Sequence, residues 1–101
     1  MEKKTMPKRY SDGMLRRLRN DIPISMLISD FLNIPSKISE GYFRFLCPIC
    51  REFQTATNPS TNLARCFRCE KNFNTIDMVM TVQHCNFKQA VEYLDGLRFP
   101  S

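Results

Sequence analysis

The sequence predicts an α+β fold, a small antiparallel β-sheet packed by short flanking α-helices, and three observations support this. Two Cys-x-x-Cys pairs, Cys47/Cys50 and Cys66/Cys69, are separated by 15 residues, a spacing typical of a metal site between two turns. Short segments rich in aromatic residues and threonine lie next to the pairs, as β-strands do. Segments with apolar residues at helical spacing precede and follow them. Together these patterns predict a zinc ribbon flanked by helices.

The length and the charge distribution indicate a single domain with a basic N-terminal segment. The chain has 101 residues, of which 43% are hydrophobic and 25% charged, ordinary values for a globular domain. The net charge of +5 arises within residues 1–20, where seven basic residues stand against two acidic ones. We expect residues 1–10 to form a flexible basic tail and residues 11–101 to form the domain. The tail either binds phosphates or another acidic partner through its charge, or is a solvated segment that only aids solubility.

The sequence also indicates a cytoplasmic protein without membrane contact. No apolar run approaches the length of a membrane span, and the first 30 residues hold no secretory signal. Cysteines stay reduced in the cytoplasm, and reduced cysteines in pairs favour a metal over disulfides.

The N-terminal elements are predicted to be two helices and a connector. Ser11 can cap a helix that runs to about Arg19. Pro23 fits the first position of a second helix, because the apolar residues after it recur on one helical face. These residues are Ile24, Leu27, Ile28, Phe31 and Leu32. Residues 33–41 contain a proline, two serines and a closing glycine, and they are predicted to connect this helix to the sheet.

The remaining elements are three strands and two helices. Strands are predicted over residues 42–47, 55–57 and 63–66, with a turn over residues 58–62 between the second and the third. Asn74 and Asn86 can each cap a helix with apolar residues at helical spacing. Gly96 is a suitable stop for the last helix.

The cysteine pairs predict one structural zinc ion. Two tight turns bring four thiolates together, and a tetrahedral shell of sulfur suits zinc. Because Cys47, Cys50, Cys66 and Cys69 fill all four positions, no position remains open for a catalytic water. His84 and Cys85 are left over. They could form a second metal site or replace one of the four ligands, but we expect a half-buried thiol beside a surface imidazole.

Aromatic and basic residues around the two cysteine pairs are candidate nucleic-acid contacts. Aromatic faces stack on bases and cations meet the phosphate backbone. The candidates are Tyr42, Arg44, Arg51, Arg65, Phe67, Arg68 and Lys71. Strand alternation predicts that about half of the aromatic residues in this region build the core instead. The cations have an alternative role, because four thiolates and Zn²⁺ carry a formal charge of about −2 that they would offset.

No catalytic motif is found in the sequence. It lacks a P-loop, a glycine-rich dinucleotide loop and an H-E-x-x-H segment. The carboxylates are scattered along the predicted helices. We therefore expect that the chain alone is not an enzyme.

The order of the motifs resembles the N-terminal zinc-binding domain of bacterial DNA primases of the DnaG family, the CHC-type zinc finger. The residues that carry the resemblance are Cys47-Pro48-x-Cys50, Cys66-Phe67-x-Cys69, Ile76-Asp77-x-Val79-Met80 and Phe87-x-x-Ala90-Val91-x-x-Leu94. It covers residues 22–97 and is closer still to small stand-alone proteins with this finger. The resemblance implies contact with single-stranded template DNA and help in choosing where priming starts. Polymerisation belongs to a separate catalytic domain of the family.

This sequence departs from the family pattern in three places. Cys50 stands where the family usually has histidine, so the metal site has four cysteines. Residues 54–57 replace the family's T-P-S-F segment, and residues 70–73 replace a glycine-rich stretch. Three functions remain open. They are a DNA-binding module that works with a primase catalytic subunit or a helicase in replication, a protein-interaction adaptor with the ribbon as scaffold, and a primase subunit active only in trans.

Overall fold

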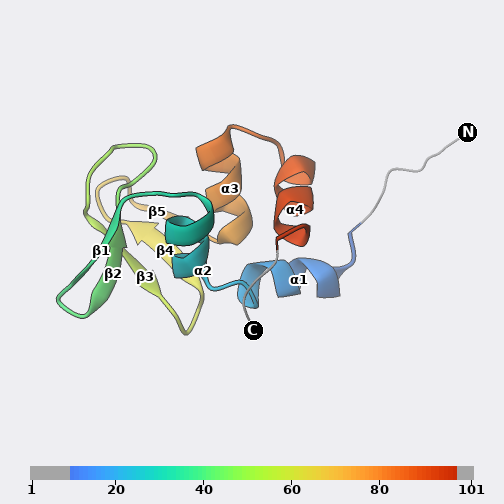
Figure 1. The fold of residues 1–101 in the computed structure, drawn as a ribbon, viewed down its shortest axis with the longest axis horizontal. Helices are drawn as coiled ribbons and strands as arrows, with labels where there is room; N and C mark the ends of the chain where they lie inside the picture. The colour runs from blue at the N-terminus through green and yellow to red at the C-terminus, as the bar shows by residue number, and fades with distance from the viewer. Residues whose placement is uncertain (1–9, 98–101) are drawn as a thin grey trace, which may run out of the picture.

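The computed structural model describes residues 10–97, with helices at one end and β-strands at the other (Figure 1). The α+β fold predicted from the sequence is confirmed, because helices pack on small antiparallel sheets that hold the clustered cysteines. Apart from Tyr10, the predicted basic tail lies outside the described residues. Within residues 10–97, no helix is both long and apolar enough to cross a membrane.

Three of the helices begin at the predicted capping residues. The Ser11 side chain accepts a hydrogen bond from the backbone of α1 (Asp12–Asn20). Asn74 and Asn86 form capping boxes at the starts of α3 (Thr75–Gln83) and α4 (Phe87–Asp95). Each cap satisfies backbone N–H groups that the helix itself leaves unpaired.

The second predicted helix is shorter and wider than expected. Pro23 is its cap and not its first residue, and α2 (Ile24–Met26) continues directly into a π-helical turn, η1 (Leu27–Phe31). The Ser29 hydroxyl donates to the Ser25 carbonyl at 3.0 Å, a side-chain bond that often bends helices. The apolar face is nevertheless used as predicted, with Ile24, Leu27 and Ile28 buried in the core.

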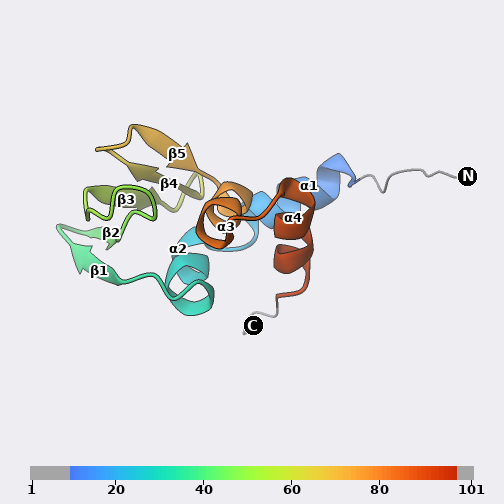
Figure 2. The ribbon, with the colours of Figure 1, turned by 90° about the horizontal axis from the view of Figure 1, so that it is seen from above.

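The β-strands form two separate antiparallel sheets (Figure 2). One sheet pairs β1 (Ser36–Ser39) with β2 (Tyr42–Phe45), and the other has β3 (Thr55–Asn58), β4 (Leu63–Cys66) and β5 (Lys71–Phe73) in that order. The predicted connector over residues 33–41 is therefore wrong, because it contains β1. The turn between β1 and β2 has positive φ at both Glu40 (56°) and Gly41 (80°), the geometry that two-residue hairpins favour. The strand β5 was not predicted either.

Side chains join the two sheets where a backbone ladder is missing. The Thr55 hydroxyl accepts from the Phe45 N–H at 2.8 Å and donates to the Phe45 carbonyl at 2.6 Å. The Arg44 guanidinium donates to the Thr55 carbonyl at 2.8 Å. In Figure 2 the strands consequently follow one another from β5 to β1 across one end of the molecule. The β1–β2 hairpin is thus held beside the three-stranded sheet as a wall.

The three-stranded sheet has a buried face and an open face. On the buried face Thr55, Thr57, Ala64, Cys66 and Phe73 are between 0% and 7% exposed. Register places Thr55 opposite Cys66, and Ala64 between Thr57 and Phe73. This face meets the apolar side of the helices, so the open face is free to form a surface site.

A buried asparagine fixes the helices to the tip of the sheet. Asn62, in the turn between β3 and β4, accepts a hydrogen bond from the Ile24 N–H at 2.9 Å. Its amide donates to the carbonyls of Arg19 and Ile22 at 2.6 and 2.7 Å. One side chain therefore ties the end of α1 and the start of α2 to the sheet.

Candidate metal centre and nucleic-acid interface

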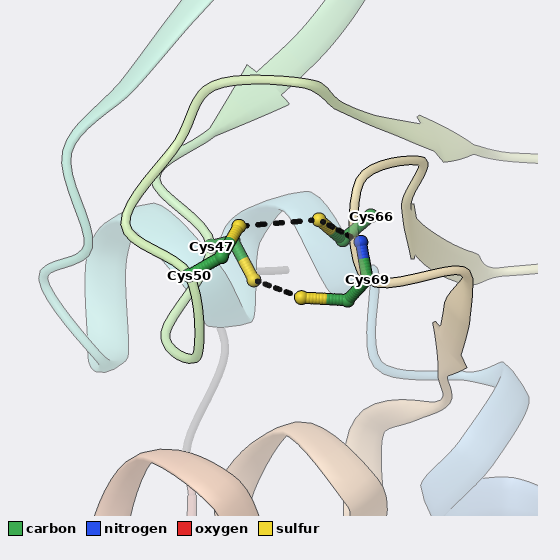
Figure 3. Close-up of side chains that lie close together, drawn as sticks. All are labelled: Cys47, Cys50, Cys66 and Cys69. Carbon is green, nitrogen blue, oxygen red and sulfur yellow. Dashed lines mark hydrogen bonds between the residues drawn. The ribbon is translucent and has the colours of Figure 1, made fainter.

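The two cysteine pairs lie in tight turns that follow β2 and β4. In the first turn the Ile49 N–H points to the Cys47 sulfur, with a nitrogen–sulfur distance of 3.4 Å. In the second, the Cys69 nitrogen lies 3.3 Å from the Cys66 sulfur. Figure 3 shows the two pairs facing each other across the gap between these turns. In the second turn, the Cys69 N–H helps to lower the pKa of the Cys66 thiol.

The positions of the four sulfur atoms fit a zinc ion. All four lie within 4.8 Å of one another. The Cys47 and Cys69 sulfurs are 3.8 Å apart, and those of Cys50 and Cys66 are 3.6 Å apart. A tetrahedron with zinc–sulfur bonds of about 2.3 Å has sulfur–sulfur edges of about 3.8 Å. The predicted cluster is therefore already arranged as a closed four-sulfur shell.

The four thiols lie so close together that they cannot all ionise without a bound cation. Burial, together with the neighbouring thiols, raises the pKa of the Cys69 thiol to about 12. Burial also raises the pKa of Cys50. Burial opposes ionisation of Cys66 too, but hydrogen bonds from the Cys69 N–H and the nearby thiols outweigh it and lower its pKa. Four thiolates therefore coexist here only when a metal ion neutralises them.

Each cysteine turn ends in a left-handed backbone conformation. Arg51 and Glu70, the residues directly after each pair, have φ values of 63° and 56°. Non-glycine residues adopt this region at a cost. The chain turns back at these residues, and after the first pair the Arg51 N–H donates to the Cys47 carbonyl at 3.0 Å.

The open face of the three-stranded sheet is the floor of a groove of about 750 Å³. Register places Ala56, Arg65 and Asn72 in one row across β3, β4 and β5. Arg65 donates to the Asn72 side-chain oxygen at 3.1 Å. The small Ala56 side chain leaves the guanidinium open on its other side, so a cation lies at the centre of the floor.

Exposed apolar side chains line the rim of this groove. Ile38 is 71% exposed, and Tyr42 and Phe67 are each 53% exposed. Tyr42 and Ile38 come from the β1–β2 hairpin, whereas Phe67 follows β4 at the turn of the second cysteine pair. Large exposed apolar groups around a concave surface mark a binding site.

Guanidinium groups lie over both aromatic rings. The central carbon of Arg65 is 5.6 Å from the centre of the Phe67 ring, and that of Arg44 is 5.4 Å from the Tyr42 ring. Such contacts hold the rings in place. Because both residues remain 53% exposed, part of each ring is still open for a planar group to stack on.

The structure brings three of the seven candidate contacts together and separates the others. Tyr42, Arg65 and Phe67 line the groove. The Arg44 guanidinium is occupied, because it donates to the Thr55 carbonyl and pairs with Glu40 at 3.1 Å. The remaining residues lie outside the groove: Arg51 lines a small hollow near His84, Lys71 lines another beside α3, and Arg68 is exposed on the second cysteine turn.

The leftover residues do not join the metal cluster. His84 is exposed and ends α3 with a φ of 53°. Cys85 is half-buried, and its sulfur lies 3.8 Å from the Val79 carbonyl oxygen. The four-sulfur group found among residues 10–97 contains neither of them.

Among the groove residues that the sequence analysis did not identify are two exposed apolar ones, Leu63 and Ile38. Leu63 shares an outward strand face with Arg65, so strand alternation along β4 was a usable signal. Ile38 was hidden, because its segment was predicted to be a connector. The Glu40-Gly41 turn was the signal that marked this segment as a hairpin.

Comparison with known proteins places the chain in a family. Residues 10–97 match the family model of the CHC2 zinc finger, the zinc ribbon of DnaG. The chain is also 31% identical over 93 residues to a DNA primase of Streptomyces coelicolor. That match covers 90% of this chain but only 14% of the primase, so the chain spans a small part of its relative's length. With the cysteine cluster, the family supports one structural zinc ion. The resemblance stated from the motifs is confirmed, and this protein belongs to the CHC2 zinc finger family.

Proposed function

We propose that this protein is a zinc-stabilised module that binds single-stranded DNA in primase-related replication. The observation that carries the proposal is the groove on the open sheet face. It combines exposed aromatic rings, Tyr42 and Phe67, with the Arg65 cation on its floor. Bases stack on such rings, and cations attract the phosphate backbone.

The shape of the groove favours a single strand over a duplex. Stacking on Tyr42 or Phe67 requires a base whose face is free, and in a duplex both faces are covered by neighbouring bases. A volume of about 750 Å³ accommodates unpaired nucleotides lying across the sheet. The β1–β2 hairpin that forms one wall of the groove has strands of only four residues, so the groove is too small to enclose a double helix.

Zinc has a structural role in this proposal. The ion would be held by Cys47, Cys50, Cys66 and Cys69, and it would fix the turns after β2 and β4. The second turn carries Phe67, so metal binding also positions one of the stacking residues. The closed sulfur shell leaves no position for a catalytic water. The chain alone is therefore expected to make no primer on a single-stranded template.

The relationship to a DNA primase indicates the setting in which the module works. The match covers 14% of that primase, so we expect the module to act beside a catalytic subunit or a helicase. It would deliver template to that partner, either as an accessory DNA-binding module or as a primase subunit active in trans.

The test compares two arginines that lie three positions apart. Fluorescence anisotropy would measure binding of labelled oligothymidine at several salt concentrations. Arg65→Ala should weaken binding and lower the slope of log affinity against log salt by about 0.7. Phe67→Ala should weaken binding by about 5- to 150-fold, from ~1–3 kcal/mol for one stacked base.

Arg68→Ala is the matched control, because Arg68 carries the same charge outside the groove. If it has the same effect as Arg65→Ala, the groove is not the binding surface. If deletion of residues 1–10 abolishes binding while Arg65→Ala changes nothing, the basic tail binds the DNA. No binding at low salt would instead favour an adaptor that uses the exposed apolar rim, with Ile38 at 71% exposure, to meet a protein.

A further inference from the structure

The polar side chains of the groove are not a balanced set of donors and acceptors. An arginine has only donors, so it is the side-chain oxygen of Asn72 that faces Arg65, at 3.1 Å. That contact uses the acceptor of the Asn72 amide. The NH₂ group of Asn72 is therefore the part that remains for a ligand.

In a second groove asparagine, Asn58, the side-chain oxygen is likewise already used as an acceptor within the protein. The Asn58 side-chain oxygen accepts from the Ser60 N–H and the Ser60 hydroxyl, both at 3.0 Å. Its NH₂ group is thus also left for a ligand. No carboxylate is among the groove-lining residues within the described part of the chain. Hydroxyl groups supply the remaining side-chain acceptors, and these can equally donate.

The floor therefore presents hydrogen-bond donors to whatever base lies in the groove. Arg65 keeps donors beyond the one that Asn72 takes, and Asn72 adds its NH₂ group beside them in the same row. Guanine offers two adjacent acceptors, O6 and N7, which suit the donor fork of an arginine. Adenine offers N7 next to an NH₂ group, so it would place a donor against donors.

We propose that Arg65, held by Asn72, makes this groove selective for guanine in a single strand. The proposal rests on the DNA-binding function given above and adds base selectivity to it. Arg65 is the residue that reads the base. Asn72 is a positioning residue that fixes the guanidinium and adds a donor. The walls formed by Tyr42 and Phe67 hold the faces of the base, and the floor meets its edge.

The experiment uses oligothymidines of about 10 nucleotides, within the usual site size of such proteins, that carry one central dG, dA or dC. Binding of each to the full chain would be measured by fluorescence anisotropy. The dG strand should bind about 5- to 150-fold more tightly than the dA strand, the discrimination expected of one bidentate contact. A strand with 7-deazaguanine, which lacks the N7 acceptor, should lose most of this preference.

The Arg65→Lys variant distinguishes base recognition from electrostatic attraction to phosphates, because it keeps the charge but loses the planar pair of donors. It should reduce the preference for dG to about two-fold or less while the salt dependence on oligothymidine stays near wild type. Asn72→Ala should reduce the preference in part, and Arg68→Lys should leave it unchanged.

The failure of this proposal differs from the failure of the proposed function. Equal binding of the dG and dA strands, or preference for dC, would overturn guanine selectivity and leave DNA binding intact. A preference for dG that persists in Arg65→Lys would show that another residue reads the base. If no strand binds, both proposals are overturned.

Discussion

Replacing Asn62, the buried asparagine at the tip of the three-stranded sheet, by alanine should strongly destabilise the fold. The side chain is 8% exposed and makes three hydrogen bonds to the backbone of α1, α2 and the residues between them. Each such bond contributes about 1 kcal/mol net, and an orphaned buried partner costs about 1–3 kcal/mol. The loss of three bonds therefore lowers the free energy of unfolding by at least about 3 kcal/mol.

The backbone of Asn62 adds a second contribution. Its φ is 55°, in the left-handed region that asparagine tolerates and alanine does not. Asn62→Ala should thus cost about 1 kcal/mol more than Asn62→Gly, which loses the same bonds without the backbone penalty. The total for alanine is about 4 kcal/mol, a large part of the stability of a small domain.

Urea unfolding followed by far-ultraviolet circular dichroism would measure both variants against wild type. Zinc is kept in excess so that metal binding does not vary between samples. Free energies of unfolding within about 0.5 kcal/mol of wild type for both variants, a difference typical of neutral surface changes, would show that Asn62 does not hold the helices to the sheet. Equal values for alanine and glycine would show that the left-handed conformation adds nothing.

Three further predictions concern the metal site. Cys66→Ser should lose zinc and unfold, whereas Cys85→Ser should keep its zinc, as elemental analysis and circular dichroism would show; full zinc in Cys66→Ser would contradict the ligand set. Zinc binding should release one proton each from Cys50 and Cys69, because their raised pKa values keep them protonated at neutral pH, and the affinity should fall as the pH falls. Calorimetry in two buffers of different ionisation enthalpy would detect that release, and buffer-independent heats would exclude it. Glu70→Gly should stabilise the folded protein by about 0.5–1 kcal/mol by relieving the positive φ after the second cysteine pair; unfolding experiments that show destabilisation would contradict this.

The helix starts were predictable because their chemistry is local. Ser11, Asn74 and Asn86 each bond to a backbone N–H three residues later, and the sequence alone contains both partners. The two unpredicted strands have weaker local signals. Each has one large apolar residue, Ile38 in β1 and Phe73 in β5, among polar residues with low strand propensity. Their pairing depends on neighbours in the folded sheet.

The metal cluster was predictable from spacing, whereas the groove was not. Cysteine pairs carry their geometry in the sequence, because each turn is short and both turns end at strands. The groove arises from the placement of two sheets, which depends on contacts between Thr55 and Phe45, ten positions apart. For the same reason the sequence could not show that Arg44 is occupied by the Thr55 carbonyl and Glu40. Tertiary contacts decide which cations remain for a ligand.

The most direct test of the DNA-binding groove is a nuclear magnetic resonance titration of the ¹⁵N-labelled zinc protein with oligothymidine. The account predicts that amide signals of the open sheet face shift first, with Ala56, Arg65 and Phe67 among them, while those of α4 stay in place. Shifts confined to α4, or to Arg51 and Arg68 on the cysteine turns, would contradict it.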